Sequence, residues 1–178
     1  MKLATTPPPT SGPILSAILG IMSNFNLTSE DIKNPVTYQR FVEACKYGFA
    51  ERTLLGDWNN PDARPALMNL TLKLTNPNWA KEIKKRISDD WTSQDPRYYG
   101  AQYHTEDDDG TSHTSVIAPN GDAVAVTSTI NTIFGSQVLS PSTGIFLNNQ
   151  MDDFSTPGIK NAYGIEPSEA NFIKPGNR

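Results

Sequence analysis

Apolar residues recur at helical spacing near the start of the chain. Four prolines between residues 5 and 13 favour an extended lead-in, because proline does not propagate a helix beyond its first turn. Pro13 suits the first helical position, where its missing N–H costs nothing. The spacing predicts a short helix over residues 13–23 with one buried stripe. That stripe consists of Ile14, Leu15, Ile18, Leu19 and Met22.

The clearest helical pattern begins at Asn34, which suits a helix cap, and Pro35, which suits the first turn. Apolar residues then follow at steps of three or four positions until Gly56 ends the pattern. The predicted buried face consists of Tyr38, Phe41, Val42, Cys45 and Phe49. Because Cys45 lies on this stripe, we interpret its thiol as buried and inert rather than reactive.

A third helix is predicted over residues 78–88, with Ile83 and Ile87 facing inward and a basic outer face exposed to solvent. Residues 57–66 carry turn chemistry, with several Asn, Asp and Pro. Residues 88–110 are polar and show no periodicity, which indicates an exposed loop.

The period of the pattern changes to two after Thr111. Asn120 and Gly121 are a strong hairpin signal, and they separate two runs rich in Val, Thr and Ile, residues 112–119 and 122–130. The pattern therefore predicts an antiparallel hairpin that begins at residue 111.

Composition limits the classes of partner. The 178 residues fit one domain. Lys and Arg number 15 against 19 Asp and Glu, and without a basic block the chain offers no surface for nucleic acid. A single cysteine excludes an internal disulfide and a thiolate metal cage. Residues 135–178 are dense in Gly, Pro, Ser and Asn, which indicates loops over a core.

Targeting signals are sparse. The most apolar run, residues 14–22, has about half of the ~20 residues needed to span a bilayer, so we expect no signal or transmembrane segment in this chain. Two N-glycosylation tripeptides begin at Asn26 and Asn69. They are compatible with a secretory route and also with chance.

The acidic run at residues 106–109, close to His104, is a candidate metal site. With Gly110 as the sixth residue of a calcium loop, the first and twelfth positions would be Thr105 and Val116, where the pattern requires acidic ligands. We therefore interpret the run as a charged loop. No metal is predicted, and nothing in the sequence indicates a cofactor.

A serine-type triad is a second option for chemistry. His113 would share a strand face with Thr111 and Ser115, because residues two apart along a strand point the same way. One flank of a strand does not by itself align a base with a hydroxyl. The preferred interpretation is a strand histidine whose ring is hydrogen-bonded.

Thr111 offers a third option as an N-terminal nucleophile. A threonine hydroxyl needs an adjacent base at neutral pH. Cleavage just before Thr111 would create that base, because a free α-amine titrates near ~8. The β-branch of threonine restricts its rotamer, and Gly110 tolerates the strained backbone that self-cleavage requires.

Thr111 also stands in a longer pattern. This pattern comprises residues 109–116 (DGTSHTSV), 127–131 (TSTIN), 134–136 (FGS), 144–145 (GI) and 147–154 (LNNQMDDF). Further segments are residues 7–13, 43–44, 52–57 and 170–176. In order and spacing the pattern resembles the gamma-glutamyltranspeptidase (glutathione hydrolase) family. The resemblance covers the whole chain but only part of the family's length.

The resemblance implies that the precursor cuts itself between Gly110 and Thr111, and that Thr111 is the nucleophile in both processing and turnover. Thr129 matches the position whose hydroxyl supports the nucleophile. Three other matching positions hold the α-amino and α-carboxylate end of the γ-glutamyl group: Asn131, Gln150 and Asp153. A carboxylate such as that of Asp153 suits an ammonium partner.

The implied fold is α+β, a partial αββα sandwich of the N-terminal nucleophile hydrolase type. Residues 1–110 resemble the end of the large subunit, with helices and the acidic loop. Residues 111–178 resemble the start of the small subunit, with the hairpin and loops. Together they are expected to form part of one domain.

The implied reaction is acyl transfer through a threonyl ester. The donor is glutathione or another γ-glutamyl small molecule, and the acceptor is water, an amino acid or a dipeptide. The two subunits pair after cleavage, outside the cell or at the outer face of the plasma membrane. In the family, the oxyanion-hole glycines, a serine pair and an arginine fall outside these 178 residues. The alternative is therefore an inactive truncated product that acts as an interaction or regulatory module.

Overall fold

The computed structural model describes residues 3–103, 111–161 and 163–176, and it combines helices with an antiparallel hairpin. The α-helices are α1 (Gly12–Met22), α2 (Pro35–Arg52), α3 (Arg64–Leu74) and α4 (Pro77–Arg86). The strands are β1 (Ser112–Ile117) and β2 (Ala123–Ser128). Short 3-10 turns follow at Ser23–Phe25, Ser29–Lys33, Pro96–Tyr99, Gln150–Asp153 and Glu169–Asn171. The α+β class is confirmed, whereas two strands do not test the layers of a sandwich.

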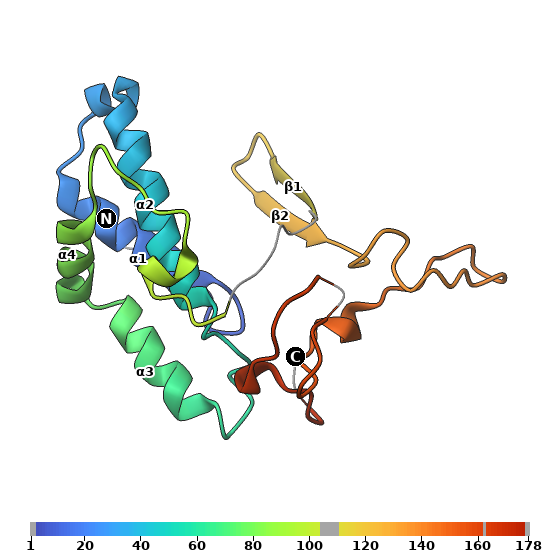
Figure 1. The fold of residues 1–178 in the computed structure, drawn as a ribbon. Coiled ribbons are helices and arrows are strands. Elements are labelled where there is room, and N and C mark those ends of the chain that lie inside the picture. Colours follow the sequence, from blue (N-terminus) through green and yellow to red (C-terminus); the bar gives the residue numbers. More distant parts are fainter. Residues whose placement is uncertain (1–2, 104–110, 162, 177–178) are drawn as a thin grey trace.

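Helix α1 lies at the centre of the helical group and contacts α2, α3 and α4 (Figure 1). Ile14 and Ile18 are buried as predicted, but Leu15 is 46% exposed because the buried face continues through Ala17 and Ile21. The cluster of buried residues formed by the helical group and its connections consists of Ile14, Ala17, Ile18, Ile21, Ala44, Tyr47, Ala50, Leu70, Leu74, Ala80, Ile83 and Tyr99.

Helix α2 begins where the sequence predicts, with the side chain of Asn34 accepting the N–H of Val36 at 3.0 Å. The predicted buried face is wrong, because Tyr38 and Phe49 are 56% and 55% exposed. Small residues face α1 instead, and a Cβ on Gly48 would come within 2.8 Å of the Ile18 side chain. The buried residues of α2 are Glu43, Ala44, Tyr47, Gly48 and Ala50.

Helix α3 was not predicted, although its buried residues recur at helical spacing. The predicted turn region ends early, since α3 already begins at Arg64. Helix α4 confirms the third predicted helix, with Asn76 as its cap and Ile83 buried. The buried side chains of α3 are Leu67, Leu70 and Leu74.

The segment after α4 is only partly an exposed loop. Within it, the 3-10 turn Pro96–Tyr99 places Tyr99 against α2, and Tyr99 is only 6% exposed. The Tyr99 hydroxyl lies 3.0 Å from each carboxylate oxygen of Glu43, which is itself buried. A buried carboxylate requires such partners, so this polar stretch folds back onto the helices.

Strands β1 and β2 confirm the predicted hairpin, with Ser112 paired to Ser128 at its open end. At the closed end the N–H of Gly121 donates to the carbonyl of Ala118 at 2.9 Å. Gly121 has φ of +91°, which fits a three-residue loop that ends in a left-handed glycine. Every strand residue is exposed, and the hairpin contacts none of the described helices. It stands apart from them in Figure 1.

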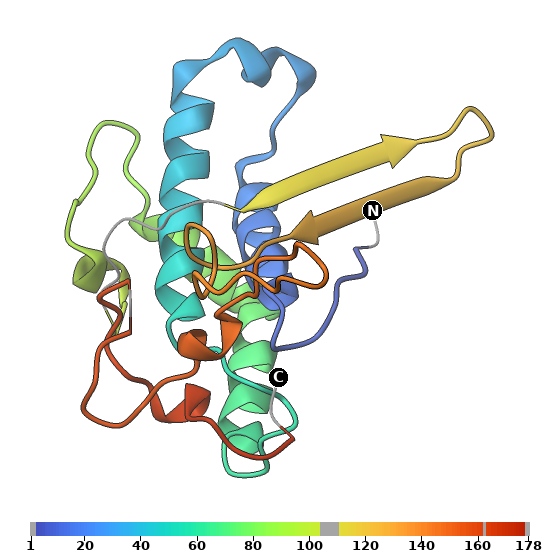
Figure 2. The same cartoon turned by 90° about the vertical axis from the view of Figure 1, so that its right-hand side faces the viewer.

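The C-terminal segment, residues 150–161 and 163–174, returns to the connection between α2 and α3 (Figures 1 and 2). Gly56 lies so close to Ala170 that a Cβ would come within 2.5 Å of the Ala170 carbonyl oxygen. Lys174 forms an ion pair with Asp62 in the same connection. These contacts join the part that follows the hairpin to the helical group.

Candidate active site

The open end of the hairpin brings two threonines together. Because Ser112 pairs with Ser128, continuing the register by one step sets Thr111 opposite Thr129. Opposed residues of an antiparallel pair direct their side chains to the same face. Thr111 and Thr129 do line one cavity. The observed register thus places two hydroxyls at one end of the sheet.

Asn131 follows β2 with a left-handed φ of 75°, which asparagine tolerates better than most residues. Its backbone N–H donates to Oγ1 of Thr129 at 2.9 Å. Its side-chain Nδ2 donates to the carbonyl of Asn149 at 3.3 Å, and its Oδ1 accepts the hydroxyl of Tyr163 at 2.9 Å. Two other segments, at Asn149 and Tyr163, therefore fix the orientation of this side-chain amide.

Asn149 ties the turn after β2 to the segment before the 3-10 turn Gln150–Asp153. Its Oδ1 accepts the N–H of Thr132 at 3.2 Å and the hydroxyl of Thr132 at 3.0 Å. Gly135 passes beside Leu147 with φ of +55°, and a Cβ there would come within 2.3 Å of the Leu147 carbonyl oxygen. Only glycine permits this close approach.

The 3-10 turn carries an amide and a carboxylate side by side. Nε2 of Gln150 donates a hydrogen bond to Oδ2 of Asp153. The backbone N–H of Gln150 donates to Oδ1 of Asn148 at 3.0 Å. Asn171 holds the end of the turn, because its Nδ2 donates to the carbonyl of Asp153 at 2.7 Å and to Oγ of Ser155 at 3.3 Å.

A cavity of about 370 Å³ lies between the open end of the hairpin, the 3-10 turn and the end of α2. We call it the threonine cavity. Five residues predicted from the sequence line it together: Thr111, Thr129, Asn131, Gln150 and Asp153. The other lining residues are Arg52, Ser155, Ile159, Asn161, Tyr163, Ile165 and Asn171. Gly110, the other half of the predicted cleavage site, lies outside the described residues.

The side chains that line the threonine cavity suit a small polar ligand. Thr111 and Thr129 supply hydroxyls, and the amides of Asn131 and Gln150 supply both donors and acceptors. Asp153 provides a carboxylate that suits an ammonium group. Arg52, at the last position of α2, is the only Lys or Arg among the described lining residues. The cavity therefore brings two hydroxyls together with amides, a carboxylate and a guanidinium, which are groups that can bind a charged polar ligand.

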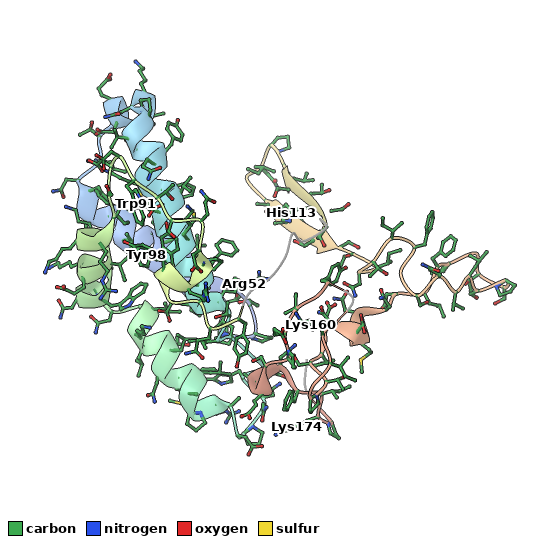
Figure 3. The ribbon with its side chains drawn as sticks, in the orientation of Figure 1. Arg52, Trp91, Tyr98, His113, Lys160 and Lys174 are labelled. Atoms are coloured by element: carbon green, nitrogen blue, oxygen red, sulfur yellow. The ribbon has the colours of Figure 1, made fainter. Side chains whose placement is uncertain are left out.

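His113 lies on β1 and does not line the threonine cavity. Its Nδ1 is 2.7 Å from Oγ1 of Thr127, and its Nε2 is 2.9 Å from Oγ of Ser115. The histidine stands on the hairpin in Figure 3. Both ring nitrogens are hydrogen-bonded, which agrees with a strand histidine rather than a triad base.

A second, larger cavity of about 510 Å³ adjoins the threonine cavity. We call it the helix cavity, because residues 46–57 of α2 and the following turn form one of its walls. The C-terminal segment, residues 93–103, Pro9 and Ser11 form the rest. Four residues line both cavities: Arg52, Ser155, Ile165 and Asn171.

Several cavity residues were not predicted as site residues. Arg52 ends α2, where a basic residue is an ordinary feature of a helix. Tyr163 and Asn161 lie in a polar stretch without periodicity, so no pattern pointed to them. Asn171 and Ser155 act through hydrogen bonds between distant segments, which a single sequence does not reveal.

The remaining sequence candidates are partly tested. In residues 3–103, 111–161 and 163–176, no group of three or more His, Cys, Asp or Glu could hold a metal ion. His104 and residues 106–109 lie outside these ranges. Asn26 and Asn69 are both exposed, the latter on α3. None of the helices described is long and apolar enough to cross a membrane.

Comparison with known proteins gives a consistent result. The family model of gamma-glutamyltranspeptidase matches residues 1–178. Scoloptoxin SSD14 of Scolopendra dehaani is 46% identical over 182 residues, which cover 100% of this chain and 30% of that protein. Glutathione hydrolase 2 of Arabidopsis thaliana is 44% identical over 181 residues, with 99% and 30% covered. The glutathione hydrolase proenzyme of Arthroderma benhamiae is 37% identical over 178 residues, with 100% and 30% covered. The chain thus spans about 30% of the length of these relatives.

Proposed function

The chain belongs to the gamma-glutamyltranspeptidase family, and we propose that it supplies the nucleophile and part of the substrate pocket for γ-glutamyl transfer and hydrolysis. The observation that carries this proposal is that Thr111 lines one cavity with the four other residues of the predicted site. The donor is glutathione or another γ-glutamyl small molecule. The acceptor is water, an amino acid or a dipeptide.

The first step of the proposal is self-cleavage. Oγ of Thr111 attacks the carbonyl carbon of Gly110, and the peptide C–N bond breaks to leave an ester and a free α-amine on Thr111. Water then hydrolyses the ester and leaves a carboxylate on Gly110. The name "proenzyme" of one relative supports processing of this kind.

In turnover, the α-amine of Thr111 accepts the proton of its own hydroxyl as Oγ attacks the γ-glutamyl carbonyl. The amide C–N bond breaks, the leaving amine takes the proton, and a γ-glutamyl ester remains on Thr111. Water or an acceptor amine then attacks this ester and restores the hydroxyl. Each tetrahedral intermediate needs an oxyanion hole, and losing one donor of such a hole costs about 3 kcal/mol of barrier.

We assign the neighbouring residues the following roles. Thr129 supports the nucleophile from the opposite strand, as its register position suggests. Asp153 binds the α-ammonium of the γ-glutamyl group, with Gln150 hydrogen-bonded to the same carboxylate. Asn131 orients the α-carboxylate or α-amine through its fixed side-chain amide.

The proposal extends to assembly and location. Residues 1–110 belong to a large subunit and residues 111–178 to a small subunit, which stay paired after cleavage as parts of one αββα domain. The exposed hairpin then forms the centre of its sheet, with further strands on either side. The enzyme works outside the cell or at the outer face of the plasma membrane, where Asn26 and Asn69 carry glycans.

Mass spectrometry of the purified protein tests the processing step. Wild type should split after residue 110, and Thr111→Ala should stay intact because it lacks the hydroxyl. Thr114→Ala is the matched control, since Thr114 lies exposed on β1 and lines neither the threonine cavity nor the helix cavity. The complete gene product should release nitroaniline from a γ-glutamyl nitroanilide. An intact wild-type chain without this turnover would favour the inactive interaction module instead.

A further inference from the structure

Arg52 stands where the threonine cavity and the helix cavity meet. It is the last residue of α2 and lines both cavities. Figure 3 shows its side chain at the end of α2 that faces the C-terminal segment. The guanidinium lies 5.8 Å from the centre of the Phe49 ring, one turn earlier on the helix. This contact and the negative end of the helix dipole both favour a cation at this place.

The guanidinium of Arg52 forms no hydrogen bond or ion pair with another residue in the described part of the chain. The other charged groups at the helix cavity are engaged. Nζ of Lys46 donates to the hydroxyl of Thr92 and to the carbonyl of Ser93 at 2.9 Å. Glu166 pairs with Lys160 at 2.7 Å. Arg52 is therefore the cation that a ligand in these cavities would meet.

We propose that Arg52 binds the terminal carboxylate of the dipeptide whose amine is released from the γ-glutamyl donor, for example cysteinylglycine. The same contact would hold an acceptor dipeptide whose amine attacks the ester on Thr111. This inference rests on the proposed function. The planar guanidinium offers a two-pronged match to a carboxylate, which a lysine ammonium does not. The helix cavity is then the acceptor subsite, beside a donor subsite in the threonine cavity.

The geometry indicates that Arg52 binds the acceptor dipeptide rather than the γ-glutamyl donor group. In the threonine cavity, Asn131, Gln150 and Asp153 already provide the polar partners for a γ-glutamyl group. A dipeptide extends about 7 Å beyond its amine, so its carboxylate lies well away from the reacting carbonyl. The helix cavity, at about 510 Å³, has room for such a molecule, and Phe49, Leu55 and Ile165 give it apolar walls for the side chain.

Two donor substrates distinguish a contact with the carboxylate of the leaving dipeptide from a contact with the α-carboxylate of the γ-glutamyl group. Glutathione has a carboxylate on its leaving dipeptide, whereas γ-glutamyl nitroanilide has one only on the γ-glutamyl side. In the complete gene product, Arg52→Gln should lower the ratio of kcat/KM for glutathione to kcat/KM for the anilide by about 10-fold or more. Arg52→Lys should recover only part of this ratio, because it keeps the charge but not the planar fork.

Acceptors provide a second comparison. For transfer from the anilide, the KM of glycylglycine should rise relative to that of glycylglycine amide in Arg52→Gln. Arg86→Gln is the matched control, since Arg86 is the exposed last residue of α4 and lines neither the threonine cavity nor the helix cavity. Both ratios should stay at the wild-type value in this control. An equal loss for both donors would overturn the proposal and assign Arg52 to the γ-glutamyl side.

A binding experiment keeps the subsite separate from the proposed function. Glycylglycine and its amide are titrated into the protein and followed by NMR, without any turnover. Glycylglycine should bind about 10-fold more tightly than the amide, and Arg52→Gln should remove this preference. Equal binding of the two ligands to wild type overturns the subsite, whether or not the anilide is cleaved. An uncleaved anilide together with a retained preference overturns only the proposed function.

Discussion

At the scale of single residues, Asn131 shows how the fold leaves binding capacity unused. Its Oδ1 has two lone pairs and accepts one hydrogen bond, from Tyr163. Its Nδ2 has two hydrogens and donates one, to the carbonyl of Asn149. Among the residues that the structure describes, one further acceptor direction and one donor direction therefore remain on this amide, which is already held in place. Such a group orients a zwitterionic ligand without losing its own freedom on binding.

Cys45 gives a residue-scale prediction. Its thiol packs against the helical core, and burial raises its pKa, so the thiolate is scarcer at neutral pH than in an unfolded chain. At about pH 7 the native protein should react with iodoacetamide at least ~10-fold more slowly than the urea-unfolded protein. The rate of alkylation is followed by mass spectrometry.

A cysteine introduced at an exposed position controls for any effect of urea on the reactivity of iodoacetamide. In a Cys45→Ser background, Ser142→Cys introduces a thiol at an exposed loop position. That thiol should react at similar rates in the native and unfolded protein. Fast native alkylation of Cys45 would show that the thiol is accessible and would contradict the inert interpretation.

At the scale of elements, Glu43 joins α2 to the segment that contains Tyr99. Its carboxylate accepts the hydroxyl of Thr92 at 2.6 Å and that of Tyr99 at 3.0 Å, and Nζ of Lys46 lies 3.5 Å away. Only 1% of Glu43 is exposed. Glu43→Ala removes the buried carboxylate that accepts the Thr92 and Tyr99 hydroxyls and that faces Lys46, so we expect a loss of about 3 kcal/mol in the free energy of unfolding.

Urea denaturation measures this loss, and two variants calibrate it. Glu43→Gln keeps an acceptor oxygen and should lose less than Glu43→Ala. Glu82→Ala removes an exposed partner of Lys85 on α4 and should change stability by no more than about 0.5 kcal/mol. If Glu43→Ala matched Glu82→Ala, the buried network would contribute nothing to the fold.

The hairpin was predictable because its signals are local. Asn120 and Gly121 mark the turn, and the alternation on either side marks the two strands. The register was not predictable, because a two-residue loop would set Thr111 opposite residue 130, whereas the loop has three residues and the register sets Thr111 opposite Thr129. The joint position of Asn131, Gln150 and Asp153 came from a family pattern. No periodicity in the chain implies it.

The faces of the helices were less predictable, because they depend on partners far along the chain. On α2, Phe41 and Phe49 are about half exposed while Glu43 is buried. Glu43 is buried because its carboxylate accepts the hydroxyl of Tyr99, which lies 56 positions away in sequence. The apolar stripe alone predicts buried phenylalanines and an exposed Glu43. Helix α3 was missed for a different reason. Its residues Leu67, Leu70 and Leu74 recur at helical spacing, but this pattern follows directly after residues that favour a turn.

At the scale of the whole molecule, the helical group and the candidate site meet through the C-terminal segment. Ser155 and Asn171, which border both cavities, are joined by the N–H of Ser155 donating to the carbonyl of Asn171 at 2.9 Å. The same segment packs on Gly56 and pairs with Asp62 through Lys174. Movement of this segment would change both cavities together.

Gly56→Ala tests this connection. The new Cβ would lie 2.5 Å from the Ala170 carbonyl oxygen, so the segment must shift away from the end of α2. In hydrogen exchange, the amides of Ser155 and Phe172 should lose protection, whereas those of α1 keep it. Gly20→Ala is the matched control, because its Cβ would meet Ala80 at an ordinary 3.6 Å. Unchanged protection in Gly56→Ala would mean that the segment is held by other contacts and that the two cavities do not depend on this close approach.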